Sequence, residues 1–309
     1  MNVTNQLPAN SGSGILREAI EIMSCPRSEA THFAICHNSH IKFLLNLQSG
    51  IPYLRKTVAA YNKKLALLLK LLPCIPARLL QAAGFGYFAR ISLHPSIQAV
   101  IPPDQKWNVL VGTYDSAQKL VFQCYAGKHT PCTYIKIGNQ GSAEQMEREI
   151  LFLKKSQSYQ SFEIPHLKYS ELISEGAPFN IQVTDEFQGT RIQPILNEEI
   201  IRIAKEIAGP SVIIEGTPHT FSHGDFAPWN IRKTGTTYTV FDWEHCGMRP
   251  EGYDMAYFLI MSQIALNKRT FDEAYDIAIT QILKFDSPIQ FNKEQIYREF
   301  IKTTKTLQF

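Results

Sequence analysis

Three short motifs in the second half of the chain constrain its fold more than any other feature. They are HGDFAPWN at residues 223–230, VFDWE at 240–244 and GYDMAYF at 252–258. The turn sequence KTGT lies between the first two motifs and predicts a hairpin. Such a hairpin would bring Asn230 and Asp242 close together, so that residues from two motifs share one site.

The first motif has the spacing His-x-Asp-x-x-x-x-Asn of a kinase catalytic loop, and phosphoryl transfer explains its residue types. A carboxylate beside the acceptor, here Asp225, can orient a hydroxyl and take its proton. The amide of Asn230 can bind magnesium without adding negative charge, and Asp242 can bridge magnesium to the phosphates. We therefore expect Asp225 to be catalytic, and Asn230 and Asp242 to be ligands of Mg²⁺.

A lysine upstream completes this hypothesis. Residues 132–137 read as a strand, on which Lys136 points away from its two isoleucine neighbours and toward a cleft. There it would hold the α- and β-phosphates of a nucleotide. Its carboxylate partner would come from the helix expected at 142–155, where Glu147 and Glu149 are both candidates. Glu149 is preferred because it precedes the apolar run ILFL.

Together these motifs resemble those of the aminoglycoside phosphotransferase and choline kinase family, which shares the protein-kinase fold. The resemblance extends from about Trp107 to Phe258 and is strongest in the last three motifs. It implies two lobes with ATP between them, GTP being an alternative donor. It also implies that the linker from Asp185 to Phe187 offers its backbone to the adenine ring, and that Asp254 braces the catalytic loop.

The chain departs from the family pattern in three places. The loop expected to cover the nucleotide, residues 112–118, has one glycine and not three. The interval 189–223 is short, whereas aminoglycoside kinases have a long helical insert there, and this argues against a dedicated antibiotic-resistance enzyme. Asp242 is followed by Trp-Glu where protein kinases have Phe-Gly.

The sequence predicts an α+β protein with a bilobed, protein-kinase-like fold and a mostly helical N-terminal extension. The extension is residues 1–100, with a disordered start because its first residues are rich in Asn, Ser, Gly and Pro. Helices are expected within it at 53–72 and 77–83. The kinase-like N-lobe is placed at 101–189 and the C-lobe at 190–309. Further strands are expected at 108–112, 119–125, 167–173 and 180–187, and a helix at 198–208.

Composition limits the partners and the compartment. The net charge is only +3, from 31 basic and 28 acidic residues, so we expect no nucleic-acid partner. The six cysteines form no Cys-x-x-Cys pair, and we interpret them as free thiols. The first residues lack the basic and apolar segments of a signal peptide, so we expect a cytoplasmic protein. The segment LALLLKLL at 65–72 is too short to span a membrane, although peripheral membrane contact through this region is an alternative to a buried helix.

We expect a small hydroxylated acceptor, and a sugar or glycolipid hydroxyl first. Chains with HGDFAPWN-like loops and a helical N-terminal extension resemble phosphotransferases of bacterial surface-polysaccharide pathways. Alternatives are an aminoglycoside or choline-like amino-alcohol kinase and a pseudokinase binding module. A metallohydrolase using His223, Asp225 and Asp242 would leave Lys136 and Asn230 without a role. The sequence does not indicate the oligomeric state.

Three further side chains have more than one interpretation. His223 is expected to hold the catalytic loop by hydrogen bonds rather than to take part in chemistry. Glu244 reads equally as a further carboxylate near the metal and as a solvent-facing or salt-bridged residue. Trp229 reads mainly as packing between loop and lobe, with stacking on a sugar ring as the alternative.

Overall fold

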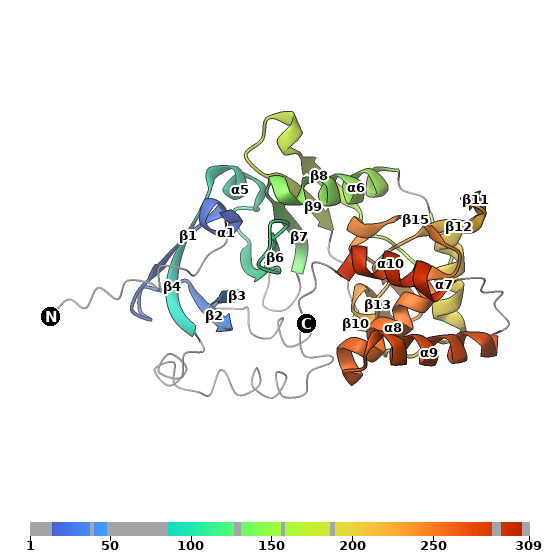
Figure 1. Ribbon diagram of the computed structural model, residues 1–309. Helices are drawn as coiled ribbons and strands as arrows, with labels where there is room; N and C mark the ends of the chain where they lie inside the picture. Colours follow the sequence, from blue (N-terminus) through green and yellow to red (C-terminus); the bar gives the residue numbers. More distant parts are fainter. Residues whose placement is uncertain are drawn as a thin grey trace. The chain divides into compact units, whose positions relative to one another are not determined.

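Two compact units make up the chain in a computed structural model (Figure 1). The first contains residues 1–146 and 167–186, and the second contains residues 147–166 and 187–309. Each unit holds both helices and strands, so the predicted α+β class is confirmed. The structure describes residues 14–37, 40–47, 86–126, 131–155, 158–185, 189–285 and 292–304.

A nine-stranded antiparallel sheet organises the first unit, with the strand order β1-β4-β2-β3-β5-β6-β7-β9-β8. Strands close in sequence are mostly neighbours in the sheet, and short turns join several of them. The strands are β1 (Ile20–Ser24), β2 (His32–His37), β3 (His40–Asn46), β4 (Gly86–Leu93), β5 (Lys106–Val111), β6 (Lys119–Tyr125), β7 (Pro131–Gly138), β8 (Leu167–Glu171) and β9 (Asn180–Asp185). The helices are α1 (Gly14–Ala19), α5 (Pro95–Val100), the 3-10 turns η2 (Gln140–Ser142) and η3 (Ile173–Glu175), and the first residues of α6 (Ala143–Lys154).

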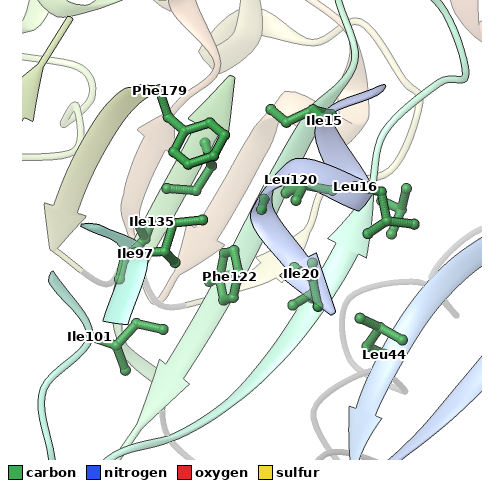
Figure 2. Close-up of a cluster of buried hydrophobic side chains, with 14 of the residues drawn as sticks. Ile15, Leu16, Ile20, Leu44, Ile97, Ile101, Leu120, Phe122, Ile135 and Phe179 are labelled. Carbon is green, nitrogen blue, oxygen red and sulfur yellow. The ribbon is translucent and has the colours of Figure 1, made fainter. Parts of the chain in front are cut away.

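One face of this sheet carries the hydrophobic core of the first unit. Alternate strand residues such as Leu120, Phe122 and Ile135 point to that face and are fully buried, as the period of two of a strand requires. Figure 2 shows Ile15 of α1 and Ile97 of α5 directed onto the same cluster. Burial of each such side chain contributes roughly 1.5–3 kcal/mol, so the two short helices are held mainly by packing.

The prediction of a mostly helical N-terminal extension is wrong for the described residues. Residues 14–47 and 86–100 consist largely of strands β1 to β4, with only two six-residue helices. Their sequences, such as HFAICH and GYFARISL, are rich in the aromatic and β-branched residues that suit a half-buried pleated surface. The helices predicted at 53–72 and 77–83 lie outside the described residues, as does the start predicted to be disordered.

The predicted boundary after residue 100 also differs from the structure. Strand β3 pairs with β5, at Phe43 opposite Leu110 and Leu44 opposite Val109, so the N-terminal strands continue the sheet of the expected N-lobe. The second boundary was placed after residue 189, whereas the units divide between residues 186 and 187. Residues 147–166, with most of α6, group with the second unit.

Two small sheets, the helices α7 to α10 and most of α6 form the described part of the second unit. The sheets have the orders β10-β13-β14 and β11-β12-β15. Helix α8 begins with ten consecutive buried residues, which identifies it as the central helix of this unit. The elements are β10 (Thr190–Arg191), α7 (Glu198–Ala208), β11 (Val212–Ile214), β12 (Thr217–Ser222), η4 (Pro228–Asn230), β13 (Ile231–Thr234), β14 (Thr237–Val240), η5 (Trp243–His245), β15 (Gly247–Pro250), α8 (Tyr253–Asn267), α9 (Phe271–Ile282), η6 (Leu283–Phe285) and α10 (Lys293–Thr304).

Within the described ranges, no helix is long and apolar enough to cross a membrane. The segment for which peripheral membrane contact was considered, residues 65–72, lies outside those ranges.

Candidate active site

The HGDFAPWN loop connects β12 to β13 in the second unit, and His223 fixes it from inside. The His223 side chain is fully buried. Its Nε2 donates to the carbonyl oxygen of Phe241 at 3.0 Å, and its Nδ1 accepts from the backbone N–H of Asp225 at 3.2 Å. Burial lowers the pKa of His223, so the neutral ring that this bonding pattern needs is favoured. These contacts agree with the expected structural role.

Asp254, in the first turn of α8, ties down the start of the same loop. Its Oδ1 accepts from Ser222 Oγ at 2.5 Å and from the N–H of Gly224 at 3.1 Å, and its Oδ2 accepts from the N–H of His223 at 2.8 Å. Asp254 is 95% buried as a residue, and the position of its carboxylate at a helix N-terminus is electrostatically favourable. Asp254 therefore braces the backbone immediately before Asp225, as the family resemblance implied.

Gly224 is required where the loop passes closest to the following segment. Its φ is +83°, in the left-handed region, and a Cβ built there would lie 2.1 Å from the carbonyl oxygen of His245. That carbonyl also accepts from Arg249 Nη2 at 2.8 Å, and Arg249 Nη1 pairs with Glu299 at 2.7 Å. The loop and residues after Asp242 are thus packed backbone to backbone.

Asp225 presents one satisfied and one unsatisfied carboxylate oxygen. Oδ2 accepts from Asn230 Nδ2 at 2.9 Å, and the same amide group donates to the Asp225 carbonyl oxygen at 2.9 Å. Oδ1 is buried and makes no well-formed hydrogen bond within the described part of the chain, although the hydroxyl of Tyr257 lies close enough to favour the charged carboxylate. A buried acceptor left unpaired costs about 1–3 kcal/mol, and such sites commonly receive a hydroxyl from a substrate.

The surroundings of Asp225 also change its acidity. Burial raises the pKa of Asp225 to about 7, and the negative charge of Asp242 adds to this rise, whereas His245, the hydroxyl of Tyr257 and Asn230 oppose it. The residue as a whole is only half-buried, but its carboxyl group is enclosed. A pKa close to neutral suits a group that must both take and release a proton.

The β13–β14 hairpin brings Asn230 and Asp242 together, as the turn sequence predicted. Ile231 pairs with Val240 in the hairpin, and the N–H of Phe241 donates to the carbonyl oxygen of Asn230 at 3.1 Å. Because Asn230 Nδ2 is engaged by Asp225, its Oδ1 is the atom that remains to bind a metal. Asp242 has a φ of +72°, an uncommon conformation that residues at functional sites often hold.

Asp242 belongs to a group of three carboxylates in the second unit. One oxygen each from Glu149, Asp242 and Glu244 lies within 4.8 Å of the others. Glu149 is 97% buried and accepts from the N–H of Trp243 at 3.2 Å. Glu244 Oε1 also lies 3.5 Å from His245 Nε2. Glu244 can therefore act both as a carboxylate near the metal and as a salt-bridged residue, the two interpretations that the sequence left open. Carboxylate and amide oxygens placed this way fit a hard divalent cation such as Mg²⁺.

Lys136 lies on β7 of the first unit, between Val121 of β6 and Gln182 of β9. Its strand neighbours Ile135 and Ile137 are fully buried in the core, so Lys136 projects from the opposite face of the sheet. This agrees with the orientation expected from the strand period. The proposed contact of Lys136 with nucleotide phosphates stays a prediction.

The remaining predicted residues are placed as follows. Glu149 is buried and Glu147 is exposed, which favours Glu149 as the functional carboxylate. Glu149 belongs to the second unit, so its pairing with Lys136 of the first unit stays a prediction. Asp185 ends β9 and forms an ion pair with Lys168. Phe187 lies outside the described residues.

Two neighbours of Asp225 were not predicted from the sequence as functional. The sequence indicated no role for His245, and Tyr257 entered only as part of the GYDMAYF motif. Both act on the ionisation of Asp225. His245 reaches it from across the hairpin and Tyr257 from one turn into α8, so no local spacing signals either contact.

A separate cavity of about 360 Å³ lies in the second unit among α7, β12 and the start of α8. Ser222 and Asp254 line it, but Asp225, Asn230 and Asp242 do not. The cavity therefore lies beside the hydrogen bonds by which Asp254 holds the start of the catalytic loop, and it is not the site where the candidate catalytic groups meet.

The comparison with protein families decides between the interpretations of this loop. Residues 174–286 match the family model described as the phosphotransferase enzyme family, APH. This match, over part of the chain, bears out the predicted resemblance to that family. The matched segment contains the catalytic loop, the β13–β14 hairpin and the start of α8, and with it the predicted enzyme class, a small-molecule phosphotransferase, is confirmed as well.

Several solved structures are similar to the chain at low identity. One is amicoumacin kinase hAmiN in complex with AMP-PNP, Ca²⁺ and Ami, with 11% identity, a TM-score of 0.38, and coverage of 68% of this chain and 83% of that chain. A thermostable mutant of aminoglycoside phosphotransferase APH(4)-Ia has 9% identity, a TM-score of 0.40, and coverages of 63% and 84%. A choline/ethanolamine kinase family protein from Mesorhizobium loti has 12% identity, a TM-score of 0.31, and coverages of 70% and 92%. No curated protein matches the chain.

Proposed function

We propose that this protein transfers the γ-phosphate of ATP to a hydroxyl group of a small molecule, in a reaction that depends on Mg²⁺. The observation that supports this most is the Oδ1 atom of Asp225, which is buried and makes no well-formed hydrogen bond among the described residues. It lies beside an amide and a carboxylate, Asn230 and Asp242, that suit a metal ion bound to phosphates.

Asp225 would act on the acceptor. The acceptor hydroxyl donates its hydrogen bond to Oδ1, while Asn230 keeps Oδ2 engaged and so fixes the orientation of the carboxylate. As the acceptor oxygen bonds to the γ-phosphorus, the bond from that phosphorus to the bridging oxygen of ADP breaks. The proton of the hydroxyl passes to Asp225 and then to solvent, which a pKa of about 7 permits.

The nucleotide and its metal ion would be held by the residues that the sequence motifs named for them. Asn230 Oδ1 and the carboxylate of Asp242 would bind Mg²⁺, which when present supplies positive charge to the phosphate oxygens. From the family resemblance, we assign Lys136 to the α- and β-phosphates and Glu149 to the orientation of that lysine. The linker from Asp185 to Phe187 would contribute backbone groups to the base of ATP, or of GTP as an alternative donor.

For the acceptor we propose a sugar or glycolipid hydroxyl. The HGDFAPWN loop resembles that of phosphotransferases from bacterial surface-polysaccharide pathways. The interval 189–223 holds only β10, α7 and β11 before β12, with no long helical insert for a bulky polycation. Trp229, in the catalytic loop, is partly exposed and has an aromatic face of the kind that sugar rings pack on.

The experiment is a measurement of Mg²⁺-dependent ADP release with a panel of sugars, glycolipid analogues, amino alcohols and aminoglycosides. We expect one sugar-containing class to accelerate release and Asp225→Asn to abolish the acceleration. Asp276→Asn, an exposed carboxylate on α9, is the matched control and should behave as the wild type. MgATP binding with no acceleration by any member of the panel would contradict the proposal and favour a binding module.

A further inference from the structure

The loop between β5 and β6, residues 112–118, is the segment expected to cover the nucleotide. It has a single glycine, and its backbone is fixed by its own side chains. Asp115 Oδ1 accepts from the N–H of Ala117 at 2.9 Å, and Gln118 Nε2 donates to the carbonyl oxygen of Gly112 at 3.1 Å. The N–H of Gly112 closes the loop onto the carbonyl oxygen of Lys119 at 2.9 Å. The loop is therefore preformed rather than freely adaptable.

Tyr114 attaches this loop to the N-terminal strands. Its hydroxyl donates to the carbonyl oxygen of Ile41 on β3 at 2.6 Å. The ring of His40 packs on the ring of Tyr114 with centroids 4.2 Å apart, and Lys42 Nζ lies 5.0 Å from the centroid of the same ring. Three consecutive residues of β3 thus hold one side chain of the loop. The ring also packs against the core cluster of the first unit.

The tip of the loop is supported from a second side. A Cβ built on Gly141, in the 3-10 turn η2, would lie 1.8 Å from the carbonyl oxygen of Ser116. The backbone of the turn therefore lies directly against the backbone of the loop, and only glycine allows this approach. Contacts from β3 on one part of the loop and from η2 on another restrict its movement.

We propose that the N-terminal strands position the nucleotide-covering loop through Tyr114, so that the extension is a working part of the nucleotide site. This inference rests on the proposed function, which makes residues 112–118 a nucleotide loop. A loop ordered in advance loses less conformational entropy when the nucleotide binds, and the affinity rises accordingly. In this chain the support from β3 takes the place of an adaptable glycine-rich loop.

Tyr114→Phe tests the proposal, since it keeps the ring and its packing and removes only the hydrogen bond to Ile41. Tyr87→Phe is a matched control, because Tyr87 is a half-buried tyrosine packed on the same core whose hydroxyl has no partner among the described residues. A single intramolecular hydrogen bond is worth about 0.5–1.5 kcal/mol, which corresponds to a roughly two- to tenfold effect on binding. We expect Tyr114→Phe to weaken MgATP binding by this factor in calorimetry, and Tyr87→Phe to leave it unchanged.

Hydrogen exchange of the full-length protein gives a second readout that does not depend on nucleotide. The amides of Ala117 and Gln118 should exchange faster in Tyr114→Phe than in Tyr87→Phe. Equal MgATP affinity and equal exchange in the two variants would overturn the proposal and leave the proposed function intact. A wild-type protein that does not bind MgATP would contradict the proposed function instead, and the exchange rates would then decide on the Tyr114 contact alone.

Discussion

Replacing Asp225 with asparagine should stabilise the metal-free protein while it abolishes phosphotransfer. Burial and the charge of Asp242 raise the pKa of Asp225 from 3.8 to about 7 in the folded state. Below about pH 4 Asp225 is protonated in both the folded and the unfolded chain, so it does not lower the free energy of unfolding. Between about pH 4 and pH 7 only the folded state keeps the proton, so the free energy of unfolding falls as the pH rises. Above about pH 7 Asp225 is charged in both states, and its buried charge lowers the free energy of unfolding by the full amount.

The magnitude follows from the size of the pKa change. A rise of about three pKa units, at about 1.4 kcal/mol each, means that the charged Asp225 lowers the free energy of unfolding by at most about 4 kcal/mol. Because Asp225 is only half-buried as a residue, we expect about half of this, or about 2 kcal/mol, at pH 8. Asparagine has the same shape, can still accept from Asn230, and can place an N–H toward the hydroxyl oxygen of Tyr257.

The assay is thermal unfolding at pH 5 and pH 8 in the presence of a chelator, with Asp276→Asn as the control. For a protein of this size, about 2 kcal/mol corresponds to roughly 4–8 °C in Tm. We expect Asp225→Asn to exceed the wild type by this amount at pH 8 and by less than half of it at pH 5. A Tm advantage that does not change with pH, or a lower Tm at pH 8, would refute the argument from burial.

Three further substitutions test the other parts of the site. Asp242→Ala should abolish MgATP binding in calorimetry, whereas Asp225→Ala should preserve binding and abolish turnover; equal loss of binding in both would contradict their separate roles. Gly224→Ala should lower the free energy of unfolding, measured with denaturant, by more than about 2 kcal/mol, because the added Cβ would meet a backbone carbonyl. Gly216→Ala is the control: Gly216 also has a positive φ but has open space around it, so the loss should be about 1 kcal/mol. Asp254→Ala should cost about 3 kcal/mol by leaving buried donors unpaired, and a loss below about 1 kcal/mol would contradict its bracing role.

Elements with strong local patterns could be predicted from the sequence. The strand predicted at 119–125 and the helix predicted at 198–208 have these bounds in the structure, and the helix predicted at 142–155 is α6. For each of these elements, the apolar pattern and the residues that begin and end it lie within one short stretch of sequence, so no distant contact is needed to predict it. The KTGT turn likewise predicted the hairpin that joins Asn230 to Asp242.

Contacts between distant segments could not be predicted in this way. The pairing of β3 with β5 joins residues more than sixty positions apart, and this pairing makes the N-terminal strands part of the sheet. The hydrogen bond from Tyr114 to Ile41 depends on that pairing. His245 influences Asp225 only because the hairpin folds back on the catalytic loop. A motif identifies the chemical groups, but their acidity depends on neighbours that only the fold supplies.

The central claim is that Asp225 promotes transfer of the γ-phosphate of ATP to a hydroxyl group of a small molecule. Phosphorus NMR of the full-length protein with ATP, Mg²⁺ and each candidate acceptor tests this most directly, because it resolves the phosphate in the product. The account predicts a new phosphomonoester signal that grows in step with ADP in the wild type and is absent in Asp225→Asn. Release of inorganic phosphate alone, or a phosphomonoester formed equally well by Asp225→Asn, would contradict it.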